Sequence, residues 1–260
     1  MIDPASDRER LIRLKEESGV DRVWLSHWHE DHIADLDLFD DVPLWVSEAD
    51  AAPLSDIELF LDAYGMGGDF RDEWRNTMKH QFHFKPRTPE RFLKPGETLD
   101  LGNVTVDVIS TPGHTPGHLS FFFREPNVLF LGDYDLTRFG PWYGDRDSNL
   151  DEVMASVEIL KQMSAEVWLA CHETGVFEKE PGDLWDDYIG VVSRREQRLL
   201  ELLDSPKDLE QIIDAGIVYN RPGAREPFFR FGEAAIMAKH LERNIRKGVI
   251  LHQNGCYVRA

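Results

Sequence analysis

Three histidines and two acidic residues occur together in the segment His27–His32, whose sequence is His-Trp-His-Glu-Asp-His. Neutral imidazole and carboxylate groups are the ligands that zinc, manganese and iron accept in proteins. The pattern of residues 22–26 predicts a buried strand, so the first two histidines would project to the same side of an extended chain. Residues 31–39 have a helical pattern, so Asp31 and His32 would follow at the start of a helix. Such a strand-to-helix corner can direct all four side chains toward one point.

The alternative interpretation is a surface loop that happens to be rich in His and Asp, and it predicts no matching ligands further along the chain. Three candidates do follow, and each comes directly after an apolar, strand-like run: His114, Asp133 and His172. Polar side chains at the ends of several strands can meet at one edge of a sheet. The pattern therefore favours a metal site built from separate strand ends.

This set of residues, in this order, resembles the metallo-β-lactamase-fold hydrolase superfamily over residues 1 to about 175. The resemblance implies a mixed α/β fold, a four-layer αββα sandwich with the metals at the strand ends between two sheets. It implies that one metal is held by His27, His29 and His114. It implies a second metal held by Asp31, His32 and His172, with Asp133 bridging the two. His118, the second histidine of the Thr-Pro-Gly-His-Thr-Pro-Gly-His segment, would pack behind the ligands.

The expected cofactors are two divalent metal ions, zinc first, with iron or manganese as alternatives. Two such ions lower the pKa of a bridging water, which would attack a substrate whose oxygen one metal polarises. Asp31 is the candidate for the catalytic proton transfers, in addition to its role as a ligand. The function expected by elimination is hydrolysis of a small ester, lactone or thioester. Two alternatives use the same ligands: a superfamily nuclease or phosphodiesterase, and an iron-dependent oxidoreductase or dioxygenase.

The residues after the bridging aspartate combine aromatic side chains, an arginine and several glycines and prolines. A loop this close to the metals can line a substrate pocket, and its candidate pocket residues are Tyr134, Trp142 and Tyr143. The alternative is a packed loop whose aromatic side chains cap the core. The sequence leaves these two interpretations open.

The chain has 260 residues and a formal net charge of −19, which argues against a nucleic-acid partner because such proteins need a basic surface. No apolar run is long enough to span a membrane, and the first twenty residues lack a signal-peptide pattern. Its two cysteines suit a reducing compartment. We therefore expect a cytoplasmic protein whose partner is a small-molecule substrate.

The sequence pattern changes near residue 183, from alternating strands and helices to mainly helices. This change predicts a catalytic domain over 1–182 and a separate C-terminal region over 183–260. Helical patterns at 184–203, around 209–213 and at 234–246, followed by an Asn-Gly hairpin at 249–258, resemble the winged-helix-like appendage of some superfamily members. The negative charge favours a lid or a dimer contact over a nucleic-acid reader. In that case its arginines would pair with acidic groups: Arg194, Arg195 and Arg198.

Residues 1–6 look like the end of a superfamily strand whose acidic residue is Asp3. Either the hairpin that usually precedes this strand is absent, or the encoded start lies upstream and the N-terminal strands are truncated here. A bare edge strand needs cover, so we expect a homodimer or an edge blocked by a local helix. The remaining expected elements are helices at 7–18, 55–64, 69–80 and 149–163, strands at 43–46 and 166–170, and a β-meander over 91–132. Ser6 or Asp7 would cap the first of these helices, and Asn149 or Ser148 would cap the last.

Overall fold

The computed structural model describes residues 1–260 and contains two β-sheets that face each other, with helices outside them. The first sheet has three parallel strands in the order β1-β2-β3. β1 and β2 are largely buried because helices cover one face of this sheet and the second sheet covers the other. Their bounds are β1 Val23–Trp24, β2 Leu44–Ser47 and β3 Arg91–Leu93.

Helices from the first part of the chain pack on the outer face of this sheet. Asp7 caps the first of them by accepting a hydrogen bond from the backbone N–H of Arg10 at 2.9 Å, as the sequence pattern predicts. Two 3₁₀ turns, Leu36–Phe39 and Glu48–Asp50, complete this layer. Its helices are α1 Arg8–Ser18, α2 Glu30–Ile33, α3 Ala52–Ser55, α4 Ile57–Tyr64 and α5 Gly68–His80.

The second sheet has six strands in the order β4-β5-β6-β7-β8-β9, antiparallel except for the parallel pair β7-β8. The crossover between those two strands is α6 Leu150–Lys161, capped by Asn149. The strands are β4 Thr98–Asp100, β5 Thr105–Ser110, β6 Leu119–Phe123, β7 Val128–Phe130, β8 Val167–Leu169 and β9 Val176–Phe177.

The expected meander over 91–132 is wrong at its first strand. β3 pairs in parallel with β2, with Phe92 opposite Val46, and so belongs to the first sheet. The antiparallel meander begins only at β4. Local alternation of apolar residues predicts a strand but carries no information about which of two facing sheets the strand joins.

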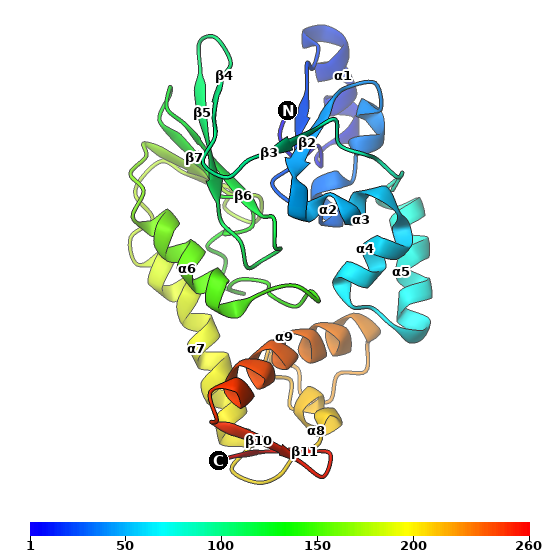
Figure 1. Ribbon diagram of the computed structural model, residues 1–260, viewed down its shortest axis with the longest axis vertical. Coiled ribbons are helices and arrows are strands. Elements are labelled where there is room, and N and C mark those ends of the chain that lie inside the picture. Colours follow the sequence, from blue (N-terminus) through cyan, green and yellow to red (C-terminus); the bar gives the residue numbers. More distant parts are fainter.

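Three hydrophobic clusters show how the layers pack. One joins Trp24 of β1 and Leu93 of β3 to Val106, Val108 and Phe121 of the second sheet, so the two sheets share a core. A second cluster lies between the first sheet and its helices, and a third lies between the second sheet, α6 and the C-terminal helices. Figure 1 shows α4 and α5 on one side of the molecule and α6 and α7 on the other. The expected four-layer αββα arrangement is confirmed.

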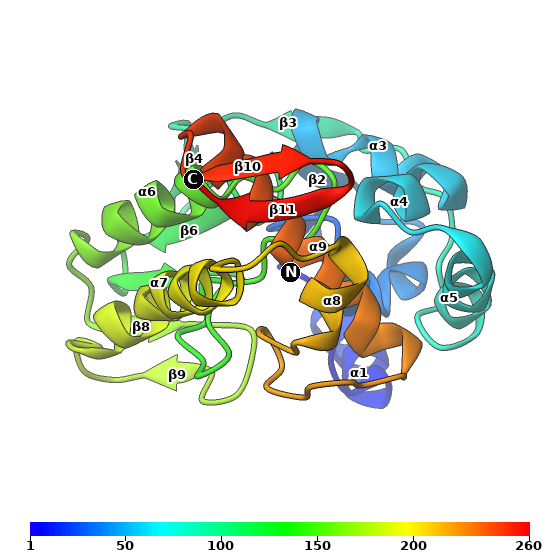
Figure 2. The same cartoon turned by 90° about the horizontal axis from the view of Figure 1, so that it is seen from below.

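The C-terminal region consists of three helices and a hairpin, as expected, and it lies beneath the two sheets in Figure 1. Helix α9 begins at Pro227, earlier than the expected start at 234. Figure 2 shows the hairpin and these helices from below. The third cluster continues from Leu129 through Trp185 to Ile250, across the boundary expected at 182, and the division into two domains stays a prediction. The elements are α7 Leu184–Leu202, α8 Leu209–Asp214, α9 Pro227–Arg246, β10 Ile250–Gln253 and β11 Cys256–Arg259.

The first residues of the chain continue the first sheet. Ile2 forms a parallel bridge with Trp24, whose backbone N–H donates to Met1 O at 2.9 Å and whose carbonyl accepts from Asp3 N at 3.0 Å. The expected homodimer stays a prediction. No helix of the structure combines the length and the apolar character that crossing a membrane requires.

Candidate metal centre

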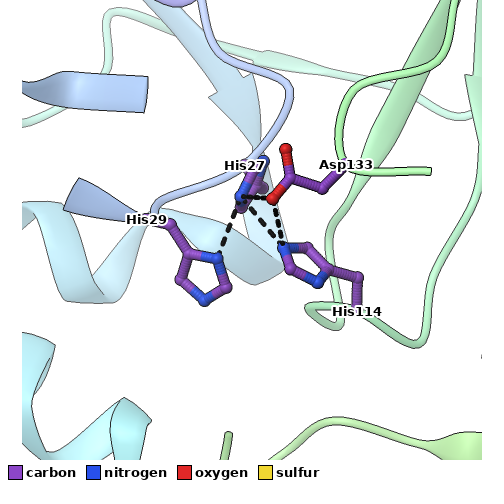
Figure 3. Close-up of side chains that lie close together, drawn as sticks. All are labelled: His27, His29, His114 and Asp133. Atoms are coloured by element: carbon purple, nitrogen blue, oxygen red, sulfur yellow. Dashed lines mark hydrogen bonds and ion pairs between the residues drawn. The ribbon is translucent and has the colours of Figure 1, made fainter. Parts of the chain in front are cut away.

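Three histidines meet at the open end of the sandwich. Nε2 of His27 lies 3.0 Å from Nδ1 of His29 and 3.1 Å from Nε2 of His114 (Figure 3). One carboxylate oxygen of Asp133, Oδ2, lies 3.7 Å from His27 Nε2 and 3.3 Å from His114 Nε2. These four ligand atoms lie within 4.8 Å of one another, so they form a first potential metal site.

The other oxygen of Asp133 faces a second group of ligands. Oδ1 lies 2.8 Å from His32 Nε2 and 3.3 Å from His172 Nε2. The same nitrogen of His172 lies 3.5 Å from Asp31 Oδ2. The structure thus brings all seven expected ligands together in two groups, and Asp133 directs one oxygen to each.

Separate elements deliver these side chains. His27 and His29 follow β1 in extended chain, and Asp31 and His32 lie in the short helix α2. The remaining ligands follow strands of the second sheet: His114 after β5, Asp133 after β7 and His172 after β8. The site therefore lies where the strand ends of both sheets meet.

Hydrogen bonds to the second ring nitrogen determine which nitrogen of each histidine is available to a metal. His29 Nε2 lies 2.8 Å from Asp145 Oδ2, and His114 Nδ1 lies 3.0 Å from the carbonyl of Trp142. Because both acceptors can only accept, these nitrogens carry the hydrogen. The lone pairs are left on His29 Nδ1 and His114 Nε2, the two atoms that point to the centre of the first group. Such contacts orient metal-ligating histidines and raise their basicity.

Asp3 has the same effect on two further ligands. Its Oδ2 accepts from Ser26 Oγ at 2.7 Å and from His32 Nδ1 at 3.0 Å. Because the Ser26 hydroxyl donates to the carboxylate, it accepts from His27 Nδ1 at 2.9 Å. The lone pairs of His27 and His32 therefore both lie on Nε2, toward the centre.

This donor set fits divalent cations. His32 Nε2 and Asp133 Oδ1 are buried, have no hydrogen-bond partner, and lie 2.8 Å apart. His27 Nε2 and His29 Nδ1 likewise face each other at 3.0 Å. Two facing lone pairs repel unless a positive charge lies between them. Nitrogen and carboxylate donors are those that zinc, iron and manganese accept.

Burial and the neighbouring charges shift the pKa values of these side chains in both directions. Burial and the neighbouring His32 hold the pKa of His27 well below its ordinary value, so His27 is neutral, as a ligand must be. Burial alone would raise the pKa of Asp133, but the surrounding histidines, His32 first, lower it well below its ordinary value. For His29, burial lowers the pKa but the Asp145 carboxylate outweighs it and raises the pKa to about 9.

His118 lies behind the ligands, where the resemblance placed it. Its Nδ1 lies 2.8 Å from Thr111 Oγ1, and its Nε2 accepts a hydrogen bond from the backbone N–H of Asp133 at 3.2 Å. Gly132 has a φ of 62°, and a Cβ at that position would meet His118 Nε2 at 2.5 Å. The glycine thus allows the close approach through which His118 positions the bridging carboxylate.

A cavity of about 220 Å³ opens from the ligands toward solvent. Glu30 lines it and accepts a hydrogen bond from the Tyr64 hydroxyl, and burial raises the pKa of Glu30 to about 7. No lysine or arginine lines the cavity. Its apolar wall comes from three parts of the chain and consists of Met66, Phe70, Trp74, Phe139, Trp142, Phe228 and Phe231.

Residues 1–172 match the model of the metallo-beta-lactamase superfamily, a span that contains every ligand described above. The chain belongs to the metallo-β-lactamase superfamily. The expected resemblance is therefore confirmed.

About half of the chain is similar to each of two curated relatives. It is 32% identical over 139 residues to a probable metallo-hydrolase of Streptococcus pyogenes, covering 51% of this chain and 55% of the relative. It is 28% identical over 154 residues to a hydroxyacylglutathione hydrolase of Haemophilus influenzae, covering 51% and 59%. The chain thus spans little more than half the length of these curated relatives.

The fold of this superfamily member is similar along its whole length to that of a metallo-beta-lactamase family protein from Thermus thermophilus. The TM-score is 0.74 at 23% identity, covering 100% of this chain and 89% of that chain. A beta-lactamase domain protein from Burkholderia ambifaria gives a TM-score of 0.72 at 18% identity, covering 100% and 82%. The similarity includes the C-terminal helices and hairpin.

The expected pocket residues require correction. Trp142 lines the cavity, but Tyr134 and Tyr143 are fully buried and do not. The Tyr134 hydroxyl donates to the carbonyl of Pro112 at 2.9 Å, and the Tyr143 hydroxyl lies 2.9 Å from His240 Nε2. Both rings belong to the hydrophobic cluster between the second sheet, α6 and the C-terminal helices. The loop thus lines the cavity through Trp142 and packs into the core through Tyr134 and Tyr143, so each of the two interpretations holds for part of it.

Several residues of the site were not found by sequence reasoning. Asp145, which holds His29, follows a strand-free loop and carries no motif. The aromatic wall from Phe70, Trp74 and Phe231 depends on contacts between α5 and α9, which are far apart in the chain. Only Asp3 had a signal, its place in a superfamily strand, although its contacts with Ser26 did not follow from it.

Proposed function

We propose that this protein is a metal-dependent hydrolase that acts on a small, uncharged ester, lactone or thioester. The observation that carries the proposal is the pair of ligand groups joined by the two oxygens of Asp133. The names of the relatives, a probable metallo-hydrolase and a hydroxyacylglutathione hydrolase, support hydrolysis and include a thioester substrate.

Two divalent ions in such a site supply an acidic water and a Lewis acid for the substrate oxygen. We assign them to the two groups, zinc first, with iron or manganese as alternatives. The side chain of Asp31 is 44% exposed and lines the cavity, so it can exchange protons with both the site and solvent. We therefore propose Asp31 as the residue that transfers protons, in addition to its place among the ligands.

The charge of the cavity supports an uncharged substrate. Its lining contains four carboxylates, those of Glu30, Asp31, Asp133 and Asp135, and no lysine or arginine. Two ions would offset the ligands among them but would leave no fixed cation beyond the metals to receive a carboxylate or phosphate. The apolar wall favours burial of an acyl or aryl group. Glutathione thioesters, penicillin-type lactams and phosphodiesters all carry a negative charge near the reacting bond or on the leaving group.

The proposal is tested by metal analysis combined with matched substrates. Protein purified without added metal should hold about two metal ions per chain. Asp133→Ala should lose metal from both positions and lose hydrolysis, whereas Asp147→Ala, an exposed aspartate of the same loop, should keep both. Full metal occupancy in Asp133→Ala would contradict the bridging assignment.

The substrate class is tested with two thioesters of the same acid that differ only in the thiol. A thioester of an uncharged thiol should be hydrolysed with a higher kcat/KM than the glutathione thioester of the same acid. The reverse preference would overturn the assignment of an uncharged substrate while leaving metal-dependent hydrolysis intact.

A further inference from the structure

A second cavity, of about 230 Å³, lies on the other side of the loop that forms the wall of the metal site. It is lined by four arginines in a chain whose net charge is −19. Three of them, together with Val191, lie at positions 191, 194, 195 and 198, which is one face of helix α7. Arg138 of the loop and the segment 217–218 form the opposite wall.

The arginines of this cavity make no ion pair, contrary to the expectation for Arg194, Arg195 and Arg198. Their hydrogen bonds end on neutral oxygens: Arg194 on Asp187 O, Arg195 on Phe139 O, Pro141 O and the Tyr143 hydroxyl, and Arg198 on Ile217 O. Elsewhere arginines of this acidic chain find carboxylates readily. Arg75, Arg230 and Arg243 each contact two.

Arg195 shows most clearly that positive charge in this cavity lacks a carboxylate partner. It is 3% exposed, and its Nε has no hydrogen-bond partner. A buried charged donor without a partner is costly, because it has lost its hydration without replacement. The carboxylate of Glu233, which is close enough to sense the charge of Arg195, is already engaged. It accepts from the backbone N–H groups of Val218 and Tyr219, at 2.9 Å each. One engaged carboxylate thus faces this group of guanidinium charges.

We propose that this cavity is a binding site for a phosphate group of a small molecule. The guanidinium group presents a planar fork of donors that matches phosphate oxygens. Arg138, Arg194 and Arg198 are exposed, so their remaining donors are available to a ligand. Several uncompensated positive charges suit a multiply charged phosphate better than a single carboxylate.

The site adjoins the metal cavity through Phe139, which lines both. The guanidinium of Arg195 lies 4.6 Å from the centre of the Phe139 ring. The phosphate can therefore come from two sources. It is carried on a part of the substrate that remains outside the metal cavity, or it belongs to a separate ligand bound behind the wall.

The test is calorimetric titration of the metal-loaded protein with inorganic phosphate at constant ionic strength. The double variant Arg194→Gln/Arg198→Gln should bind phosphate at least roughly 10-fold more weakly, because two charged donors are lost, and Arg138→Gln, on the opposite wall, should also weaken binding. The control Arg246→Gln, an exposed arginine of α9, should bind like the wild type. All of these side chains are exposed, and because Arg198 also donates to Ile217 O, thermal unfolding of each variant is measured to confirm that it is folded.

Two results would overturn the proposal: no phosphate binding by the wild type, or equal binding by the wild type and the double variant. The second would place the anion at the metals, and it would then be lost in Asp133→Ala instead. Metal content measured after each titration shows that phosphate has not removed the ions. The binding measurement does not require hydrolysis, so its outcome is separate from that of the proposed function.

Kinetics then identify the source of the phosphate. Because the proposed substrate is uncharged, a thioester whose leaving group carries a phosphate should have the same KM as the matched unphosphorylated thioester in the wild type. Equal KM values, together with arginine-dependent binding of free phosphate, assign the site to a separate ligand. A lower KM for the phosphorylated thioester that vanishes in the double variant would instead assign the site to the substrate and overturn the assignment of an uncharged substrate.

Discussion

Replacement of Asp145 by alanine should weaken one metal position and leave the other nearly unchanged. Asp145 is 1% exposed, and its two oxygens accept from His29 Nε2 and from Trp142 Nε1, each at 2.8 Å. Without the carboxylate, His29 loses the partner that keeps its lone pair on Nδ1. Removal of such partners lowers metal affinity by about 10–100-fold, which corresponds to about 1.4–2.7 kcal/mol. His29 belongs only to the first ligand group, so the loss should fall on that ion.

The assay is competition with a chromophoric chelator, which resolves two metal dissociation steps, with Asp147→Ala as the control two residues away. Only one of the two steps should shift in Asp145→Ala, and Asp145→Asn, whose amide oxygen can still accept one hydrogen bond, should shift it less. A wild-type affinity at both positions would refute the reasoning. Equal weakening of both ions would show that Asp145 acts on the whole fold and not through His29.

Three further predictions follow from other contacts of the structure. Gly132→Ala should lower the free energy of unfolding in chemical denaturation by about 1–3 kcal/mol or more, because of the positive φ and the contact of the new Cβ with His118. The loss should be larger than that in Gly102→Ala, where a Cβ meets nothing within 4 Å. Phe231→Ala should raise KM for long acyl substrates roughly 5–10-fold with little change in kcat for acetyl substrates; an unchanged KM would remove α9 from the pocket. The protein should show no salt-sensitive nanomolar affinity for RNA or DNA in binding titrations, because its surface is strongly acidic.

The residues that meet at the candidate metal centre could be found from the sequence because each lies next to a strong local signal. His27 and His29 follow an apolar strand, and His114, Asp133 and His172 follow three others. An apolar run that predicts a strand also predicts where the strand ends. The polar residues that follow each run can therefore be identified as candidate ligands. The helix caps were similarly local: Asp7 and Asn149 act on N–H groups only two or three residues away.

The partners of the ligands could not be predicted, because they depend on contacts between distant segments. Asp145 and His29 are 116 residues apart in the chain, and Asp3 and His32 are 29 apart. No periodicity links such pairs. The same holds for β3, whose residues predict a strand but not the sheet that it joins, and for the pocket wall contributed by Phe228 and Phe231 of α9.

The expected pairing of the α7 arginines with acidic groups was wrong for a physical reason. Net charge describes the average surface, whereas a guanidinium group pairs with whatever acceptor the fold brings near it. Around Arg195 and Arg198 the fold brings backbone carbonyls of two loops, so these side chains hold loops in place and keep their charge uncompensated. Composition therefore describes the average charge of the surface and does not predict the charge of one local cavity.

The loop between Asp133 and Ser148 lies between the candidate metal ligands and the C-terminal helices. It begins with the bridging carboxylate, supplies Trp142 to the cavity, and ends near Asp145, which orients His29. The C-terminal helices hold this loop at three points. The Tyr188 hydroxyl donates to Asp133 O at 2.9 Å, Arg195 donates to Phe139 O at 2.8 Å, and His240 Nε2 lies 2.9 Å from the Tyr143 hydroxyl. Helices α7 and α9 are thus part of the support of the metal centre, because displacing them would release the loop that carries its bridging ligand.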